Sequence, residues 1–339
     1  MLKKDDFNYF STYLIAAEAA RRGVKVKKMF TSGPLVKHSV VEMNYRGRYE
    51  ILYGQRTADI SAPAYWVTKN KQATKVVLKR AGINVSRGDI FNKHQIKEAV
   101  TLAKNIGFPV VIKPYDGIQG KRVFVGLADE RAVKRAIREV AKHHFYFLVE
   151  EQFIGDEYRI LATKEKFVAA INRIPANVTG DGHHSITELI AIKNSDPRRG
   201  TGHKKSLVRI TVDDTVVAML KSQRLTLRSR PAAGTVVYLR QNSNLSTGGD
   251  SIDATDVVHP AVKKLAVKII RAIPGLGYAG IDFLTTDITK PPTKHNYIVI
   301  ELNDSPMISM HHIPYQGQSH DAASAIVDLL FPETVKKKK

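Results

Sequence analysis

The sequence contains no cysteine, which excludes a disulfide framework, a thiolate zinc site and a thiol nucleophile. No stretch approaches the roughly 18 uncharged apolar residues of a membrane-spanning helix. The charged N-terminus is not followed by the apolar core and cleavage site of a secretory signal. Acidic residues are also few, with 32 Asp and Glu against 53 Lys and Arg and a net charge of +21. We therefore expect a soluble cytoplasmic protein with an anionic ligand and no membrane partner.

The remaining composition is that of a folded protein. The chain has 339 residues, of which 43% are hydrophobic and 25% charged, values close to the globular average. Short strand-like and helix-like segments alternate, which predicts an α+β protein. We divide it into an N-terminal part (1–66), a middle part (67–150), a larger C-terminal part (151–335) and a lysine tail (336–339).

Apolar spacing and breaker residues predict the individual elements. The predicted helices are 9–22, 70–80, 130–142, 261–272 and 322–330. The predicted strands are 24–30, 48–53, 109–113, 122–127, 145–150, 280–285 and 297–303. The stretch from 155 to 239 is predicted to be rich in strands, with polar loops at 179–184 and 194–205.

Two apolar segments near the C-terminus end in acidic and amide side chains. Glu301 and Asn303 lie two residues apart on the strand Tyr297-Ile-Val-Ile-Glu-Leu-Asn303, so they share one face. Asp282 ends a similar strand. If these strands are neighbours, the three side chains form an all-oxygen ligand set of the kind that suits Mg²⁺. The alternative is a set of strand-end polar residues that face water.

A lysine and a glycine-containing turn follow the strand Phe108-Pro-Val-Val-Ile-Lys113. The turn carries Gly117 and Gly120, which permit positive φ and a close approach of the backbone. Backbone N–H groups of such a turn, together with Lys113, suit phosphate oxygens. The spacing fits neither a Walker motif nor a Rossmann fingerprint. An ordinary glycine hairpin turn is the alternative.

A third segment, Phe147-Leu-Val-Glu150-Glu151-Gln-Phe153-Ile-Gly-Asp-Glu157-Tyr-Arg159, carries an apolar strand into two glutamates and then a further acid. By itself this pattern also fits surface acids on a connector.

These three segments occur in the order and spacing of the ATP-grasp family of carboxylate–amine ligases, which the chain resembles over residues 67–332. The closest resemblance is to the glutathione synthetase-like domain of bifunctional glutathione-synthesising proteins and to the ligase domain of cyanophycin synthetase. Four phrases carry it: Asn177-Val-Thr-Gly-Asp-Gly182, Asp196-Pro-Arg-Arg-Gly200, Leu239-Arg-Gln-Asn-Ser-Asn-Leu-Ser-Thr-Gly-Gly-Asp250 and His311-His-Ile-Pro-Tyr-Gln-Gly317. The resemblance implies an ATP-grasp fold, in which two α+β subdomains clasp ATP, with a small N-terminal domain on the substrate side.

The resemblance also implies a set of nucleotide-binding residues. They are Lys71, Lys113, Gly117, Gly120, Glu150, Glu151, Phe153 and Glu157. The lysines would contact phosphates, with Lys75 as the alternative to Lys71, and the glycines would form a mobile phosphate loop. The two adjacent glutamates and the Phe153 amide would hold adenine through backbone groups, and Glu157 would bind the ribose hydroxyls.

The metal and catalytic assignments have the same basis. Asp282, Glu301 and Asn303 would hold two Mg²⁺ ions, with Mn²⁺ as a possible substitute. Some relatives carry an arginine two residues before the first metal acid, and this chain has Gly280 there. Another arginine must then stabilise the transferred phosphoryl group, and we expect Arg240, with Arg173 and Arg159 as further candidates.

The implied reaction is ATP-dependent amide formation through an acyl phosphate, on an amino acid or short peptide. A glutathione synthetase-like activity is the most specific version, and a ligase that adds amino acids to a peptide or protein acceptor is the alternative. Asn244, Ser246, Ser305 and Met310 lie on segments expected to line the acceptor side. A nucleic-acid-binding protein on a degenerate ATP-grasp fold is a third hypothesis, but stacking aromatics interleaved with basic residues are not evident, so we expect no nucleic-acid partner. Family analogy favours a homodimer.

Histidines offer a further possible metal site. His183, His184, His203, His311 and His312 include two adjacent pairs, but no helix-spaced pair with an acid occurs. We therefore expect polar loop or substrate-edge residues rather than zinc ligands.

Overall fold

The computed structural model describes residues 3–4, 7–30, 39–116, 122–202 and 204–335. The α-helices in these ranges are α1 (Phe10–Arg21), α2 (Ala62–Lys69), α3 (Lys71–Arg80), α4 (Ile96–Ile106), α5 (Glu130–Ala141), α6 (Ile186–Asn194), α7 (Asp214–Ser222), α8 (Pro260–Arg271), α9 (Ser309–His312) and α10 (Ala322–Leu330), with short 3-10 turns η3 (Leu245–Thr247) and η4 (Pro332–Thr334). The strands are β1 (Lys25–Lys28), β2 (Val40–Tyr45), β3 (Arg48–Tyr53), β4 (Gly88–Asn92), β5 (Val110–Pro114), β6 (Phe124–Leu127), β7 (Tyr146–Glu151), β8 (Asp156–Thr163), β9 (Phe167–Ile174), β10 (Asn177–Thr179), β11 (Arg199–Gly200), β12 (Leu207–Val208), β13 (Val236–Tyr238), β14 (Asp250–Asp253), β15 (Tyr278–Thr285) and β16 (Tyr297–Asn303).

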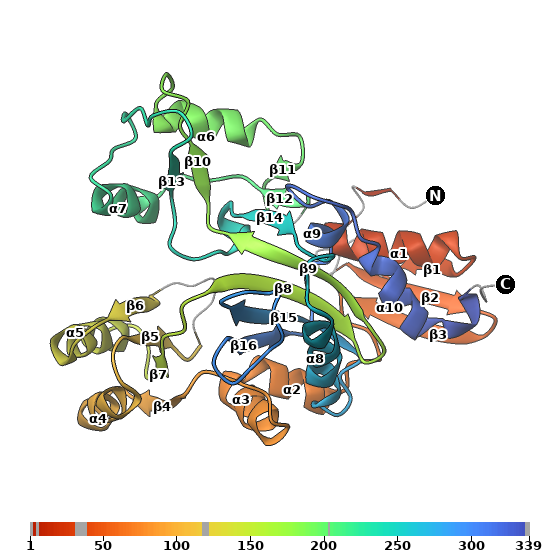
Figure 1. Cartoon of the computed structure of the whole chain (residues 1–339). Helices are drawn as coiled ribbons and strands as arrows, with labels where there is room; N and C mark the ends of the chain where they lie inside the picture. Colours follow the sequence, from red (N-terminus) through yellow and green to blue (C-terminus); the bar gives the residue numbers. More distant parts are fainter. Residues whose placement is uncertain (1–2, 5–6, 31–38, 117–121, 203, 336–339) are drawn as a thin grey trace.

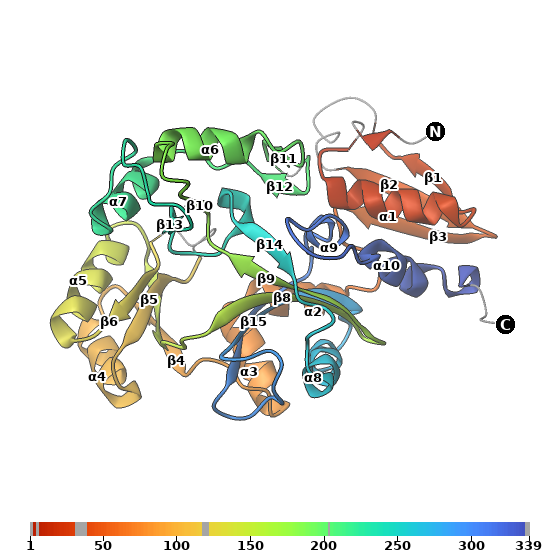
Figure 2. The ribbon, with the colours of Figure 1, turned by 45° about the horizontal axis from the view of Figure 1, so that its top comes forward.

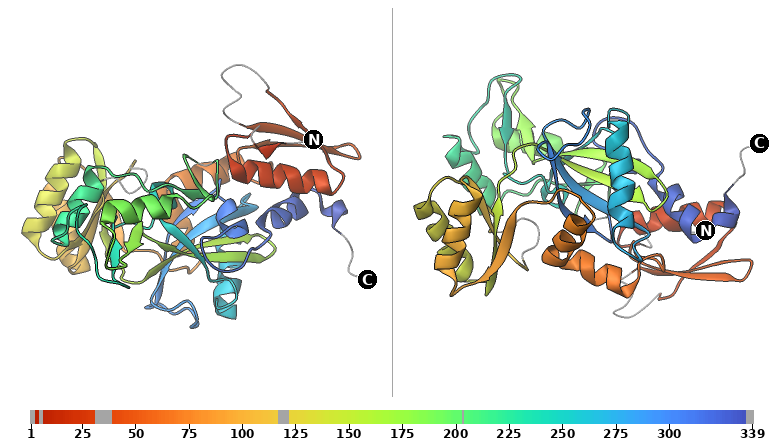
Figure 3. Two further views of the ribbon diagram at one scale, coloured as in Figure 1. Left: turned by 90° about the horizontal axis from the view of Figure 1, so that it is seen from above. Right: turned by 60° about the horizontal axis from the view of Figure 1, so that its bottom comes forward.

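A central antiparallel sheet organises the molecule, with strand order β14-β9-β8-β15-β16. Helix α8 packs along this sheet through Val262, Ile269 and Ile270, which repeat at helical spacing and are buried. Helices α2 and α3 add Ala64 and Leu78 to the same core. Figure 3 shows α8 lying along the sheet in its right-hand view. The strands β15 and β16, which carry the predicted metal residues, are therefore anchored in the largest core.

The N-terminal part forms its own three-stranded sheet, in the order β1-β2-β3, packed against α1. The buried face of α1 carries Ile15, Ala16 and Ala19, and it meets Met43 and Leu52 of the sheet. Helix α10 packs beside α1 and brings the C-terminal end of the described chain to this part, as Figure 2 shows.

A four-stranded sheet in the order β4-β7-β5-β6 forms the middle lobe, with α4 and α5 packed on it. Helix α5 is capped by the Asp129 side chain, which accepts a hydrogen bond from the Ala132 amide at 2.7 Å. Its buried residues Val133, Ile137 and Val140 recur at helical spacing. Figure 1 shows this lobe below the lobe that carries α6 and α7.

Residues 155–239 were predicted to be rich in strands, which β8 to β13 confirm, but the two helices in this stretch were not predicted. Residues 175–240 form the second lobe. Helices α6 and α7 occupy part of it and share a core with β10 and β13. The Ser185 side chain and Glu188 form a capping box at the start of α6, and the Asp213 side chain caps α7. Since both helices have only 9 residues, their apolar spacing is short and the caps are the clearer signal.

The other predicted elements all occur, with shifts of a few residues at their ends. Besides α6 and α7, the prediction did not include β2, α2, β4, α4, β14 or α9. The division of the chain at residues 66 and 150 stays a prediction, and these two positions lie inside α2 and near the end of β7.

Candidate active site

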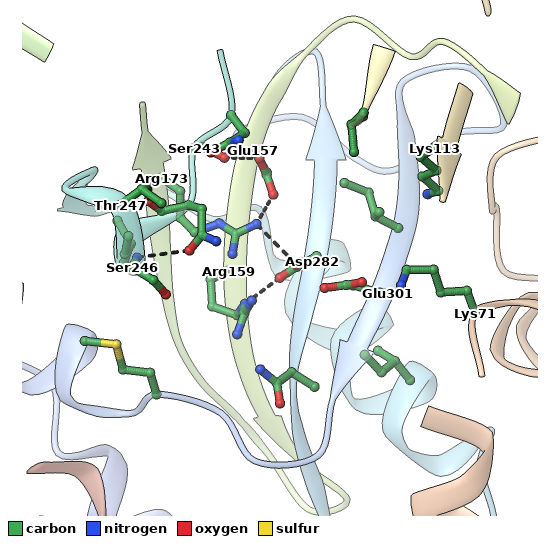
Figure 4. Close-up of a pocket in the computed structure, with 18 of the residues that line it drawn as sticks. Lys71, Lys113, Glu157, Arg159, Arg173, Ser243, Ser246, Thr247, Asp282 and Glu301 are labelled. Atoms are coloured by element: carbon green, nitrogen blue, oxygen red, sulfur yellow. Dashed lines mark hydrogen bonds and ion pairs between the residues drawn. The ribbon is translucent and has the colours of Figure 1, made fainter. Parts of the chain in front are cut away.

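A cleft of about 1790 Å³ lies between the central sheet, the middle lobe and the loop that follows β13. Figure 4 shows a close-up of a group of its residues. Each predicted site residue in the described part of the chain lines this cleft: Lys71, Lys113, Glu150, Glu151, Phe153, Glu157, Arg159, Arg173, Arg240, Asp282, Glu301 and Asn303. Gly117 and Gly120 lie outside the described residues. The predicted residues therefore line one cleft, and their roles remain proposals.

The acidic centre of the cleft comes from neighbouring strands, as the sequence suggested. β15 and β16 pair antiparallel, which sets Asp282 opposite Glu301 and Gly280 opposite Asn303. Asp282 is 4% exposed. In Figure 4 the Glu301 carboxylate lies between Asp282 and Lys71. Burial and the nearby charge of Asp282 raise the pKa of Glu301. A buried carboxylate and a partly buried one on paired strands favour a cation beside them.

Two arginines hold Asp282 in its present position. Burial alone would raise the pKa of Asp282, but Arg159 and Arg173 outweigh that effect and hold this pKa below its ordinary value. The Arg159 Nε donates to one carboxylate oxygen of Asp282 at 2.5 Å, and the Arg173 Nη2 donates to the other oxygen at 3.2 Å. Arg173 also donates to Glu157, which in turn accepts a hydrogen bond from Ser243. The network therefore links the predicted ribose residue to the predicted metal residue.

The structure accounts for the glycine two residues before Asp282. A Cβ at Gly280 would lie 2.9 Å from Cδ of Arg159 and 3.0 Å from Cβ of Pro306. Arg159 comes from β8, whose register sets it opposite Asp282. A guanidinium from the neighbouring strand therefore fills the space beside Gly280.

The lysines form a separate group at the edge of the middle lobe. The buried carboxylate of Glu150 receives Lys75 on one oxygen and Lys113 on the other, each at 2.6 Å. Burial raises the pKa of Glu150, and the two lysines overcome this and lower it. Lys75 is only 6% exposed and does not line the cleft, whereas Lys71 does. This arrangement favours Lys71 over Lys75 as the residue that reaches a ligand.

Unpaired donors in the cleft provide a test of whether these residues fit an anionic ligand. The Nε atoms of Arg173 and Arg240 are buried and have no hydrogen-bond partner within the described ranges. Arg240 is oriented by Asp213, which accepts from its Nη2 at 2.7 Å. The Phe153 amide likewise has no acceptor among the residues described here, so it is available to a ligand edge. Free donors beside an acidic centre fit a nucleotide with Mg²⁺.

The predicted acceptor-side residues Asn244, Ser246, Ser305 and Met310 also line the cleft. The N-terminal part was expected on the substrate side, but none of its residues was predicted to line the site. Its lining residues are Tyr9, Ser11, Tyr53, Gly54, Gln55 and Arg56, joined by Thr68 and Lys69 from α2. No motif marks these residues, because the turn at 53–56 reaches the cleft only through the tertiary fold.

The described histidines form no metal site of their own, although His311, His312 and His320 lie near one another. Within the described ranges no group of three or more His, Asp or Glu side chains is arranged to hold a metal ion on its own. His184 pairs with Asp181 at 2.6 Å on an exposed loop, whereas His311 is fully buried. His203 lies outside the described residues.

Comparison with known proteins agrees with this geometry. Residues 70–244 match the family model described as carbamoyl-phosphate synthase L chain, ATP binding domain. The chain belongs to the ATP-grasp family. ATP-grasp ligases use ATP and Mg²⁺, which are the ligands that the acidic centre and its lysines suit.

Individual relatives of this ATP-grasp chain are larger proteins. Cyanophycin synthetase of Trichormus variabilis is 35% identical over 326 residues, which are 95% of this chain and 35% of that protein. The glutathione biosynthesis bifunctional protein GshAB of Mannheimia succiniciproducens is 34% identical over 332 residues, covering 96% of this chain and 43% of that protein. The crystal structure of a bifunctional glutathione synthetase from Pasteurella multocida superposes with a TM-score of 0.75 at 33% identity, covering 97% of this chain and 44% of that one.

The chain thus spans less than half the length of these relatives. In the part of the chain that the structure describes, no helix is long and apolar enough to cross a membrane.

Proposed function

We propose that this ATP-grasp chain is an ATP- and Mg²⁺-dependent ligase that joins a carboxylate to an amine. The observation that carries the proposal is the convergence of Asp282, Glu301 and Asn303 with Lys71 and Lys113 in one cleft. This convergence also argues against a degenerate, nucleic-acid-binding fold, which has no need for an acidic centre beside phosphate-binding lysines.

The nucleotide is assigned to the side of the cleft next to the middle lobe. Lys71 and Lys113 contact its phosphates, and Glu150, which Lys75 keeps ionised in the interior, holds Lys113 in place through its second oxygen. The backbone of residues 150–153 receives the adenine edge, with the Phe153 amide as a donor. Glu157 accepts hydrogen bonds from the ribose hydroxyls in place of its present hydrogen bond from Arg173 or Ser243.

Asp282, Glu301 and Asn303 would hold two Mg²⁺ ions, or Mn²⁺ in their place. When bound, these ions neutralise charge on the phosphates. Positioning and charge neutralisation are the main requirements of this chemistry, which needs no protein nucleophile and therefore suits a chain without cysteine.

The proposed reaction has two steps. An oxygen of the substrate carboxylate attacks the γ-phosphorus of ATP, and ADP leaves. The amine nitrogen then attacks the acyl carbon, and phosphate leaves with the bonding electron pair as the amide forms. We assign Arg240 to the transferred phosphoryl group, because its Nε is free while Asp213 fixes its other end. Arg173, whose Nε is also free, and Arg159 remain further candidates.

The substrates are proposed to be an amino acid and a short peptide. A glutathione synthetase-like reaction is the first candidate, because the superposition with a bifunctional glutathione synthetase covers 97% of this chain. Addition of an amino acid to a peptide acceptor is the second candidate, because the identity to cyanophycin synthetase is 35% over 95% of the chain. A homodimer stays a proposal by family analogy.

The test is ADP and phosphate release from Mg²⁺-ATP against a panel of amino acids combined with γ-glutamyl dipeptides and short acidic peptides. We expect release that requires one acid and one amine together. Binding of ATP without stimulation by any pair in the panel would contradict the proposal.

Substitutions of Lys71 and Lys75, one turn apart on α3, are expected to have different effects. Lys71→Met should weaken ATP binding by about 10-fold or more, since a charge-assisted hydrogen bond contributes about 1.5–3 kcal/mol. Lys75→Met should instead destabilise the fold by about 1–3 kcal/mol, because Glu150 is buried and loses one of its two cations. ATP titration and urea unfolding of both variants separate the effects. Equal losses of ATP affinity in the two variants would contradict this assignment.

Gly280 should tolerate no side chain. In Gly280→Ala the new methyl group meets Arg159 and Pro306, so Arg159 must move away from Asp282. We expect kcat to fall by about 10-fold or more, because small displacements of positioning groups cost up to about 100-fold. Circular dichroism should show a folded protein. Unchanged kcat would mean that the position of Arg159 does not matter.

A further inference from the structure

The end of the cleft that the N-terminal part builds has a polarity that the reaction at the acidic centre does not explain. The lining residues from this part are aromatic, polar or basic, and none of those in the described ranges is acidic. Arg56 and Lys69 supply the positive charge, with exposed side-chain fractions of 27% and 43%. Both therefore reach the cleft while remaining partly covered.

A single buried aspartate positions the two cations. Asp304 is 1% exposed. One of its carboxylate oxygens accepts a hydrogen bond from Nε of Arg56, and the other lies 3.1 Å from Nζ of Lys69. Because one carboxylate neutralises only one of the two cations, a net positive charge remains at this end. Asp304 directly follows Asn303, so the cations are fixed beside the predicted metal residues.

The surrounding structure holds this arrangement rigid. Arg56 sits at the end of a tight turn in which the Tyr53 amide donates to the Arg56 carbonyl at 2.9 Å, and the Arg56 amide donates back at 3.0 Å. The Thr12 hydroxyl donates to the Gly54 carbonyl at 2.8 Å. Both cations lie over the ring of Tyr65, at 5.2 Å and 5.6 Å from its centroid.

We propose that this cation pair binds a carboxylate of the substrate other than the one that reacts. This inference rests on the proposed function and names the chemistry of its substrate subsite: a free carboxylate, contributed either by the amine substrate or by a second carboxylate of the acid substrate. Arg56 offers Nη1, to which no described residue is paired, and Lys69 offers its remaining donors, so the two can share one carboxylate.

Binding is tested first, without requiring turnover. Glutarate and glutaramide are titrated into ¹⁵N-labelled full-length protein saturated with Mg²⁺ and a non-hydrolysable ATP analogue. We expect glutarate to shift the amide signals of Gly54, Arg56 and Ser305 with saturation, and glutaramide to leave them unchanged. Lys69→Met should weaken glutarate binding about 10-fold, the loss of one charge-assisted hydrogen bond. The exposed Arg271→Gln is the matched control for loss of a cation elsewhere and should bind glutarate as wild type does.

Lys69→Met is the primary variant, because Arg56→Gln leaves the buried Asp304 with one cation fewer and risks unfolding. Equal shifts by glutarate and glutaramide, or unchanged glutarate affinity in Lys69→Met, would overturn the proposal. A chain that binds glutarate in this way but releases no ADP with any substrate pair would contradict the ligase function while leaving the carboxylate site intact.

Kinetics identify which substrate supplies the carboxylate. The amine is compared with its carboxamide (glycine with glycinamide, arginine with argininamide), and the acid is compared with its amide at the non-reacting carboxylate. For one of the two substrates, we expect replacement of the carboxylate by an amide to lower kcat/KM at least about 10-fold in wild type. In Lys69→Met the same replacement should lower kcat/KM by less than about 2-fold, because the contact between Lys69 and that carboxylate is already lost. The same penalty in both proteins, for both substrates, would overturn the assignment.

Discussion

Glu301→Ala is expected to abolish turnover while leaving the fold intact. Glu301 faces Asp282 across neighbouring strands, and the two carboxylates are the charged part of the proposed metal site. Loss of several kcal/mol of charge neutralisation in the transition state corresponds to a decrease in kcat of about 1000-fold. The substitution removes a carboxylate whose pKa burial and Asp282 already raise, so the folded protein loses no favourable ion pair of its own.

The measurement is kcat as a function of Mg²⁺ concentration, with circular dichroism to confirm folding. Glu165→Ala is the matched control, because Glu165 is an exposed glutamate whose side chain is 62% accessible and lies outside the cleft. It should retain wild-type kcat. Full activity in a folded Glu301→Ala protein would refute the assignment of the metal site.

Asp250→Ala is expected to have the largest effect on stability. Asp250 is 3% exposed and pairs with two cations: Arg199, whose side chain is fully buried, and the partly buried Lys193, at 2.6 Å. Asn177 donates to the same carboxylate at 2.9 Å. Removing it leaves two cations facing each other in the interior, and breaking such a buried pair costs about 3–5 kcal/mol.

Urea unfolding followed by circular dichroism measures this loss. The exposed Asp256→Ala, six residues along the chain, is the matched control and should change the free energy of unfolding by no more than about 0.5 kcal/mol. A loss below about 1 kcal/mol in Asp250→Ala would show that Arg199 and Lys193 find other partners or water.

The central strands of the site could be predicted because their signal is local. β16 is an apolar run that leads into Glu301 and Asn303, and it was predicted with its observed bounds, Tyr297–Asn303. The prediction that Asp282 ends its strand was wrong, because β15 continues from Asp282 to Thr285. The sequence did not establish that β15 and β16 are paired, because pairing and register depend on contacts that are distant in sequence. The structure supplies it, with Asp282 opposite Glu301.

The missed elements have two different causes. Helix α4 carries Ile96, Ala99, Val100 and Ala103 at helical spacing, and α6 begins with a capping box at Ser185 and Glu188, so both signals were present but not used. The subsite of Arg56 and Asp304 had no such signal. These residues are 248 positions apart, and neither belongs to a motif, so only the tertiary fold brings them together.

The same distinction explains the arginines. Arg159 and Arg173 were named as further candidates because Gly280 stands where some relatives carry an arginine, but nothing in the sequence shows that Arg159 fills the space beside Gly280 from the neighbouring strand. The family resemblance put Lys71 ahead of Lys75, but both lie on one face of α3, one turn apart, so the burial of Lys75 against Glu150 could be seen only in the structure.

The most direct test of the central claim follows an oxygen atom from the substrate carboxylate. With the acid–amine pair identified by ADP release, the carboxylate is labelled with ¹⁸O and the products are analysed by mass spectrometry. An acyl phosphate predicts one ¹⁸O in the inorganic phosphate released, with ADP and amide formed in equal amounts. Label in AMP, with release of pyrophosphate, or phosphate without label would contradict the account.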